Sequence, residues 1–408
     1  MDDQTIPSLN LCNKQSLTCF GENDVMVEIL TRLPIKSILK AKCVCKSWYR
    51  LLSDPIFISD YSRQNPHLRV SGFYLQKFLF LELFSELRFI VFDGQIDIAP
   101  EPSLSFIEDE EGVCIRHSCN GLLICCSFRC HEEDRIYYIC MPTTKQYFSL
   151  PRLDCRTVFG INIAFDPSKS PHFHVICICD SEISDHHRHI KLYSRDRESW
   201  RISGNPFIAA DDMLFNRGVF WNGSLHWVGR GDLSLRFDVE RELLHEMPMP
   251  SIHEGWVERR LGYFGESGGH LYLIEIYGPH TTVFDVMEMK RDYSGWFVKY
   301  HVNLNAMAVK YPGMVREHVQ QIHRFIFSIL HLIHRRGEGE GEGEEEEEDE
   351  ESFMVLHIPG MFISYNLVSG TFMELQDTSG HHRPLNKCLG LEYTWEGVHP
   401  YSNTHCYI

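Results

Sequence analysis

The stretch that decides the fold is GVFWNGSLHWVGRGDLSLRFDVERELLHEMPMP, residues 218–250. It consists of short runs of Val, Phe, Trp and Leu that are broken by Gly, Asn and Asp. Such runs are typical of β-strands joined by tight turns. A late strand carries Phe237-Asp238, and the stretch closes on two Met-Pro pairs. We therefore predict two or more strands in succession here.

Related stretches occur at residues 120–151, 173–203, 267–302 and 353–375. A late aromatic residue followed by Asp or Asn recurs in them, as in Phe284-Asp285 and Tyr365-Asn366. Tyr193 and Phe237 are 44 residues apart, and Phe237 and Phe284 are 47 residues apart. This period fits one four-stranded propeller blade of about 40–50 residues. We predict a β-propeller-like domain over residues 69–408 with six or seven blades.

Residues 22–57 have a different pattern, ENDVMVEILTRLPIKSILKAKCVCKSWYRLLSDPIF. Val25, Ile29 and Leu33 recur at helical spacing. Pro34 ends that helix and suits the first turn of another. We predict three short helices in this segment. So small a unit cannot bury all of its apolar residues, so part of this surface should face a partner or the next domain.

The net charge of −17 is uneven along the 408 residues. Residues 337–351, GEGEGEGEEEEEDEE, hold 11 acidic residues, which leaves −6 for the rest of the chain. We predict a disordered acidic loop at 337–351, because like charges repel and glycine opposes helix formation. The chain has no excess of basic residues of the kind that would indicate nucleic acid or an anionic membrane as a partner. Residues 1–21 should be a flexible N-terminus and residues 58–68 a linker.

Targeting and redox signals are few. The N-terminus lacks a signal-peptide pattern, and the apolar stretches are too short to span a bilayer. We expect an intracellular protein without a membrane segment, cytoplasmic or nuclear, whose 15 cysteines are reduced thiols.

The segments VEILTRLPIKSILKAKCVCKSW and SDPIF closely resemble the F-box motif of plant F-box proteins. The rest of the chain is similar to the F-box-associated, kelch-like region of the same family. The matching phrases include residues 120–123 (NGLL), 219–227 (VFWNGSLHW) and 289–300 (MKRDYSGWFVKY). The resemblance implies an α+β multidomain protein: a small three-helix F-box at 22–57, then a mainly-β propeller. The family usually begins with a Leu-Pro pair, where this chain has residues 20–23 (FGEN).

The resemblance also implies a function. Such proteins are substrate receptors of SCF-type cullin–RING ubiquitin ligases, which bind a Skp-type linker through the F-box and a protein substrate through the second domain. An adaptor of this kind needs no catalytic residue, cofactor or metal, because it acts by raising the local concentration of the substrate. The residues assigned to the linker contact are Val25, Ile29, Leu30, Leu33, Pro34, Ile38, Val44, Cys45 and Trp48.

Two alternatives stay open at this point. Several apolar residues, above all Ile29, Leu39 and Leu51, would instead only hold the helices together. The missing Leu-Pro pair also leaves open a non-degradative scaffolding role, in which the linker is bound but no substrate is degraded. The substrate-binding residues are not predicted by any pattern.

A further alternative is a propeller hydrolase with its site in the central channel, which predicts carboxylates or histidines that converge there. Motifs for enzymatic or metal chemistry are weak. Residues 265–269 (GESGG) match the G-x-S-x-G pattern of a hydrolase nucleophile, but the alternating residues that follow predict a strand in place of the required helix. Residues 186–189 (HHRH) are interpreted as surface residues. A zinc half-site of Cys125, Cys126, Cys130 and His131 lacks a second half. The tryptophans Trp221, Trp227, Trp256, Trp296 and Trp395 are predicted to be core or blade-edge residues.

Overall fold

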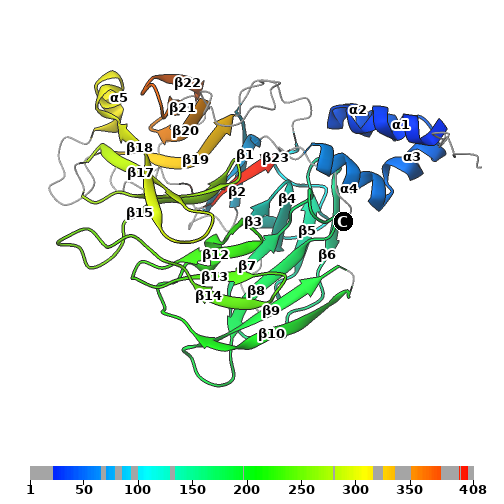
Figure 1. Ribbon diagram of the computed structural model, residues 1–408, viewed down its shortest axis with the longest axis horizontal. Coiled ribbons are helices and arrows are strands. Elements are labelled where there is room, and N and C mark those ends of the chain that lie inside the picture. The colour runs from blue at the N-terminus through cyan, green and yellow to red at the C-terminus, as the bar shows by residue number, and fades with distance from the viewer. Residues whose placement is uncertain are drawn as a thin grey trace, which may run out of the picture.

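The computed structural model describes residues 22–65, 70–78, 85–92, 100–128, 134–195, 197–278, 281–315, 325–335, 351–377, 395 and 397–402. An N-terminal unit of short helices is followed by a β-propeller, as predicted (Figure 1). Among these residues, no helix is long and apolar enough to cross a membrane. The predicted flexible N-terminus lies outside the described residues, and so does the predicted acidic loop except for Glu351, which begins a strand.

Four helices, one more than predicted, form the N-terminal unit. They are α1 (Glu22–Thr31), α2 (Ile35–Ala41), α3 (Lys46–Leu52) and α4 (Pro55–Gln64). The Asp54 carboxylate caps α4 by accepting a hydrogen bond from the Ile56 N–H at 2.8 Å, and Pro55 occupies its first turn. The prediction of a linker from residue 58 was therefore wrong up to residue 64, because Asp54-Pro55 begins a helix there.

The helical unit has a small core of its own. Its buried residues come from all four helices: Leu30, Ile38, Ala41, Leu52, Phe57 and Tyr61. The Tyr61 hydroxyl donates to the Leu33 carbonyl at 3.0 Å, and the Asn65 amide donates to the Thr31 carbonyl at 2.9 Å. Both bonds join the end of α4 to the end of α1. The fourth helix therefore completes the fold of this unit.

Six antiparallel sheets make up the described part of the propeller. The first has the order β2 (Ser85–Val91), β1 (Val70–Phe78), β23 (Gly397–Ser402). The other five each contain four consecutive strands. Their bounds are β3 (Val113–Cys119), β4 (Leu122–Ser127), β5 (Tyr137–Met141), β6 (Gln146–Ser149); β7 (Val158–Ala164), β8 (His174–Asp180), β9 (His187–Ser194), β10 (Ser199–Ile208); β11 (Val219–Trp221), β12 (Ser224–Val228), β13 (Ser234–Asp238), β14 (Leu243–Glu246); β15 (Leu261–Ser267), β16 (His270–Glu275), β17 (Val283–Met289), β18 (Trp296–Asn303); and β19 (Ser328–Arg335), β20 (Glu351–Ile358), β21 (Met361–Asn366), β22 (Phe372–Asp377).

The predicted range of six or seven blades thus resolves to six in the described residues. The short helices η2 (Phe215–Arg217), α5 (Asn305–Lys310) and η3 (Pro312–Met314) lie in connections between blades.

The last strand of the chain closes the ring. β23 pairs with β1 in antiparallel register, with Phe73 opposite Pro400 and Leu75 opposite Val398. β23 also contacts β3 on one side and β19 on the other, which are the first strands of the neighbouring blades. The first blade therefore combines strands from both ends of the propeller sequence, and the ring has no open end.

Local features that recur in several blades help to explain their formation. Asn120-Gly121 and Asn222-Gly223 both adopt positive φ at both residues, in the turn between the first and second strands of their blades. Asn-Gly is favoured in two-residue hairpin turns, because glycine and asparagine tolerate positive φ. A second repeated feature is a tryptophan on the outermost strand that bonds to a proline carbonyl. The indole N–H of Trp200 donates to the Pro151 carbonyl, and that of Trp296 to the Pro248 carbonyl, both at 2.8 Å. These bonds join an outer strand to the connection that enters its blade.

Candidate functional site

The nine residues predicted to contact a linker protein fall into three groups in the structure. Val25, Ile29, Pro34, Val44 and Cys45 are exposed. Leu33 and Trp48 are partly buried against the core of the helical unit. Leu30 and Ile38 are buried in that core. They are inaccessible to a partner in this structure, so their predicted contact role is not supported.

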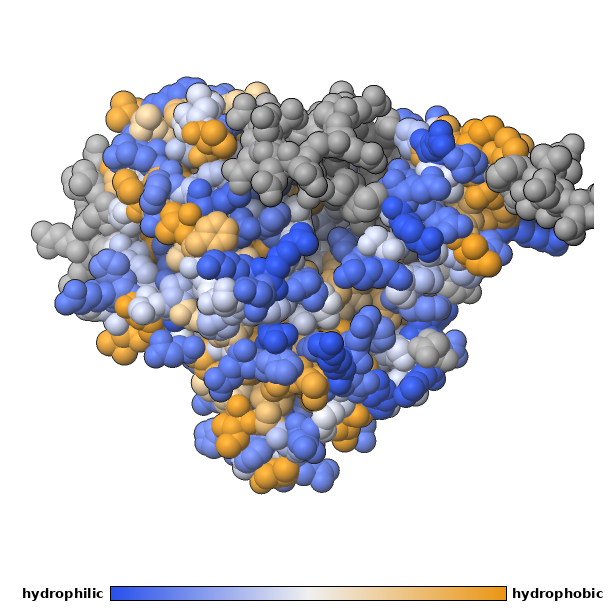
Figure 2. Space-filling model, viewed as in Figure 1, coloured by the Kyte–Doolittle hydropathy of each residue, from blue (hydrophilic) through white to orange (hydrophobic). Residues whose placement is uncertain are grey.

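The exposed group defines an apolar docking face. Ile29 is 57% exposed and Val44 is 65% exposed, although both are aliphatic. Val25 lies one helical turn before Ile29 on α1, so the two side chains share one side of that helix. Figure 2 shows hydrophobic residues gathered on the surface over α1 and α3. Ile29 was among the residues suspected of holding the helices together, and its exposure contradicts that alternative.

Sequence reasoning missed two exposed apolar residues of the helical unit, Tyr49 and Ile56. Tyr49 follows Trp48 in α3, and the Lys42 ammonium lies 5.9 Å from its ring centre. Ile56 lies in the first turn of α4 and is 73% exposed. The apolar surface therefore extends beyond the three predicted helices. No local pattern marked Ile56, because the segment was assigned to the end of the helical region.

Charged groups flank this surface. Glu28 and Arg32 form an exposed ion pair across one turn of α1. Such surface pairs contribute at most about 1 kcal/mol. The arrangement is suited to binding another protein by burial of apolar side chains, with charges at the edge to orient it.

A second apolar surface lies on the loop of residues 247–260, between β14 and β15. Val257 is 91% exposed at this loop. The Trp256 ring packs against Tyr277, with centroids 5.7 Å apart, and the Arg260 guanidinium lies 5.2 Å from the Trp256 ring centre. Tryptophan, tyrosine and arginine are the residues enriched in protein-binding hot spots.

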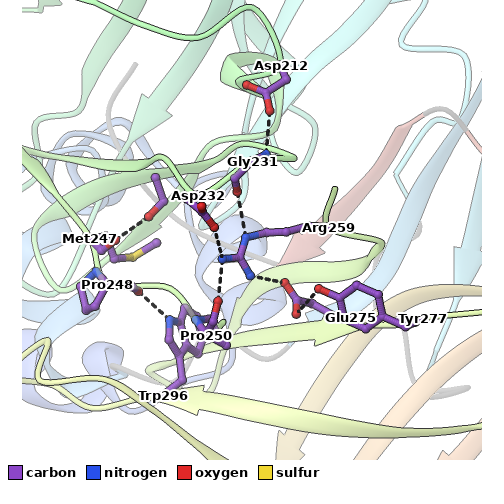
Figure 3. Close-up of polar contacts among 11 residues, drawn as sticks. Asp212, Gly231, Asp232, Met247, Pro248, Pro250, Arg259, Glu275, Tyr277 and Trp296 are labelled. Atoms are coloured by element: carbon purple, nitrogen blue, oxygen red, sulfur yellow. Dashed lines mark hydrogen bonds and ion pairs between the residues drawn. The ribbon is translucent and has the colours of Figure 1, made fainter. Parts of the chain in front are cut away.

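A buried arginine holds this loop in place (Figure 3). The Arg259 guanidinium pairs with the Glu275 carboxylate at 2.7 Å, and both side chains are buried. It also donates to the Gly231 carbonyl at 2.9 Å and to the Pro250 carbonyl at 2.6 Å. The Tyr277 hydroxyl donates to the second Glu275 oxygen at 2.9 Å. One side chain thus fixes two connecting loops to β16. The partly buried Trp256 and the exposed Val257 therefore lie on a rigid base.

The centre of the propeller contains a hollow of about 1050 Å³, lined mainly by the first strands of the blades. Five buried or partly buried histidines line it. One of them, His270, pairs with the Glu288 carboxylate at 2.6 Å. We call the other four the channel histidines: His117, His331, His334 and His399. Burial lowers the pKa of His331 and His399 to about 3, and that of His117 and His334 to about 4. All four are therefore neutral at physiological pH.

The hydrogen bonds of the channel histidines explain their positions. His117 accepts from the Ile163 N–H through Nδ1 at 3.2 Å and donates from Nε2 to the Gly218 carbonyl at 2.7 Å. This single ring joins three successive blades. The Tyr263 hydroxyl lies 3.1 Å from Nδ1 of His331, which links the next pair of blades. These contacts assign His117 and His331 a structural role between blades.

The weaker chemical motifs do not assemble into a site. Ser267 ends β15 and is followed by a glycine turn into β16, so the helix that a nucleophile elbow requires is replaced by a strand. Cys125 and Cys126 are adjacent in β4 and pack into different core clusters. Cys130 and His131 lie outside the described residues. In the described part of the chain, no group of three or more His, Cys, Asp or Glu side chains could hold a metal ion.

The histidines and tryptophans singled out in the sequence occupy packing and surface positions. His187 begins β9 and its Nδ1 lies 2.7 Å from the Ser184 hydroxyl, and His189 is partly buried in the same strand. Trp221 and Trp227 are buried, as predicted for core residues. The three other tryptophans are partly buried: Trp256, Trp296 and Trp395.

Comparison with known proteins agrees with this division of the chain. Residues 23–60 match the family model of the F-box domain, and residues 89–261 match that of the F-box associated beta propeller domain. The chain is 32% identical to the F-box protein At5g07610 of Arabidopsis thaliana over 87% of this chain and 85% of the relative. It is 29% identical to the F-box protein At5g49610 of the same plant over 76% of this chain and 86% of that relative. A putative F-box/kelch-repeat protein, At3g17280 of Arabidopsis thaliana, is 25% identical over 56% of this chain and 59% of its own length.

Proposed function

We propose that this chain, which belongs to the F-box protein family, acts as the substrate receptor of an SCF-type cullin–RING ubiquitin ligase. The helical unit would bind a Skp-type linker protein, which in turn connects to the cullin and RING subunits. The propeller would bind a protein substrate. The expected location inside the cell, in the cytoplasm or nucleus, stays a prediction.

The observation that carries the proposal is the apolar docking face of the helical unit. Val25, Ile29 and Val44 are exposed although the unit has a separate core that excludes water. Burying one Val or Ile side chain stabilises a complex by about 1.5–3 kcal/mol. Exposed apolar residues in such number on so small a unit therefore favour a permanent or frequent protein partner.

The propeller supports the second half of the proposal. Its 247–260 loop carries Trp256 and Val257 at the surface, and the buried Arg259 fixes the conformation of the loop. A rigid loop loses little conformational entropy on binding. We propose that this loop contributes to substrate binding, which needs no catalytic group.

Binding to a purified Skp-type linker tests the first half. Replacing Ile29 and Val44 together with Asp places two charges on the docking face without touching the buried core. Each buried, unpaired charge costs several kcal/mol, so the affinity should fall by at least about 100-fold. Leu33 and Trp48 are less suitable positions, because both pack against the core and their loss would unfold the unit.

The matched control is Val368→Asp, an equally exposed aliphatic residue on a propeller turn. Its linker affinity should equal that of the unmodified chain. No binding by the unmodified chain, or equal binding by the Ile29→Asp/Val44→Asp chain, would refute the proposed linker contact.

A further inference from the structure

Two cysteines face each other across the first hairpin of the second blade. Cys114 in β3 and Cys126 in β4 are directly opposite in the antiparallel register. Their sulfur atoms are 3.2 Å apart. Cys126 is fully buried and Cys114 is 4% exposed, and both belong to the core cluster between the second and third blades. Neither thiol has a role in the proposed function.

The register allows a disulfide at this position. Directly opposite residues of an antiparallel pair have Cβ atoms about 4.5–5.5 Å apart, and a disulfide requires about 3.5–4.5 Å. A small local shift therefore suffices. Cys125 and Cys140 provide a contrast within the same sheet, because their sulfurs are 3.8 Å apart but Cys125 is opposite Tyr138 and Cys140 is opposite Leu123. Such diagonal neighbours are about 7–8 Å apart, beyond the reach of a relaxed disulfide.

The surroundings make one sulfur of the opposite pair the nucleophile. The hydrogen bond with the Cys126 thiol lowers the pKa of Cys114 to about 7, with a smaller contribution from Arg116 and Arg135. The same hydrogen bond, together with burial, raises the pKa of Cys126. Cys114 is therefore the thiol of the pair that ionises more readily. The thiolate is the form of cysteine that reacts with oxidants.

We propose that Cys114 and Cys126 form an oxidant-sensitive thiol pair that closes to a disulfide with hydrogen peroxide. The Cys114 thiolate attacks one peroxide oxygen and the O–O bond breaks, which gives a sulfenic acid and hydroxide. The Cys126 sulfur then displaces the sulfenic hydroxyl, and its proton leaves with that oxygen as water. Two thiols and one peroxide thus give one disulfide and two waters. Cys114 and Cys126 are both oxidised, and the peroxide is reduced.

Two hollows lie beside a residue that neighbours the thiol pair. Tyr137 is opposite Cys126 in β5. It lines both the central hollow and a smaller hollow of about 270 Å³ beside Arg135 and Pro151. Peroxide is close to water in size, so it needs only a small opening past this ring. The disulfide would join β3, which lines the central hollow, to the strand behind it, and would raise the unfolding temperature of the chain.

Peptide mapping of the full-length protein tests the proposal directly. The folded protein is treated with hydrogen peroxide, free thiols are blocked, and trypsin is used without a reductant. Trypsin cuts after Arg116, so Cys114 lies in peptide 89–116 and Cys126 in peptide 117–129. We expect these two peptides to be joined, with a loss of about 2 Da relative to the sum of the free peptides, and to separate on reduction.

Peptide 117–129 also contains Cys119 and Cys125, so two variants assign the bond. Cys126→Ser should abolish the joined peptide, and Cys125→Ser should keep it. The proposal is overturned if the joined peptide is absent at a peroxide dose that oxidises the exposed Cys43 and Cys45. It is also overturned if the two peptides stay joined in Cys126→Ser. An absent joined peptide in the unmodified chain overturns the proposal even if a variant fails to fold.

Discussion

Replacing Arg259 with Met should destabilise the propeller far more than a surface change. The guanidinium is buried and satisfies the Glu275 carboxylate and the carbonyls of Gly231 and Pro250 (Figure 3). Methionine fills a similar volume but donates no hydrogen bond. The substitution leaves a buried carboxylate without its cation, and two carbonyls without these donors.

The magnitude follows from these contacts. Removing one partner of a buried ion pair costs about 3–5 kcal/mol, because the remaining charge stays buried and unpaired. Replacing Glu275 with Leu as well removes that charge, so the double variant Arg259→Met/Glu275→Leu should recover most of this loss. Each carbonyl left unsatisfied costs about 1–3 kcal/mol. Two carbonyls lose a donor, so the double variant should remain about 2–6 kcal/mol less stable than the unmodified chain.

Urea unfolding of the unmodified chain, the two single variants and the double variant measures these free energies. The two sites are in contact, so their effects should not add. A cost below about 1 kcal/mol for Arg259→Met would contradict the reasoning, since it would place the ion pair among solvated surface pairs. Strict additivity of the single variants would contradict it too, because the penalty is assigned to one uncompensated charge.

Three further predictions concern stability. Hydrogen bonds from Arg201 lower the pKa of Glu242 to about 2. The stability that this pair adds is therefore present above about pH 4.5 and is lost as the pH falls from about 4.5 to 2. Glu242→Gln should flatten that part of a pH–stability profile. Burial lowers the pKa of each channel histidine, so the unfolded chain takes up protons at a higher pH than the folded chain does. The free energy of unfolding should therefore fall as the pH drops from about 6.5 toward 3. The expected slope is up to about 1.4 kcal/mol per histidine for each pH unit. Denaturant unfolding at several pH values measures this slope, and a flat profile would contradict the neutral, buried state. Tyr401→Phe removes the hydrogen bond to Thr143 and should cost about 1 kcal/mol of stability. Tyr401→Ala also empties a fully buried site in the closing strand and should cost about 3–5 kcal/mol. Thermal unfolding measures both costs, and equal costs would contradict the role of the ring.

Short-range patterns were enough to predict the class of the fold. Asn222-Gly223 predicts a tight turn from its own residues, and the structure confirms it with positive φ at both positions. The recurring aromatic-Asp pairs gave the spacing of the blades. The closing contact of β1 with β23 had no such signal, because it joins residues more than 300 positions apart and depends on the whole ring being formed.

The docking face was harder to predict residue by residue. Ile29 and Leu30 are neighbours of similar hydrophobicity, yet one is exposed and the other is buried. Helical periodicity marks an apolar stripe, but where apolar residues surround most of a helix it does not tell which side meets the core. The buried Arg259 was equally hidden, because Arg259-Arg260 reads as a surface pair until the fold brings Glu275 beside the first guanidinium.

The central claim is that one chain carries both a ligase contact and a substrate contact. The most direct test is the half-life of the proteins that purify with the full-length chain, compared between cells that express the unmodified chain and cells that express the Ile29→Asp/Val44→Asp chain. Both chains keep the propeller, so both should bind the same proteins. We predict that those proteins are ubiquitinated and short-lived only with the unmodified chain. Equal half-lives with the two chains would contradict the claim and would favour a scaffolding role without degradation.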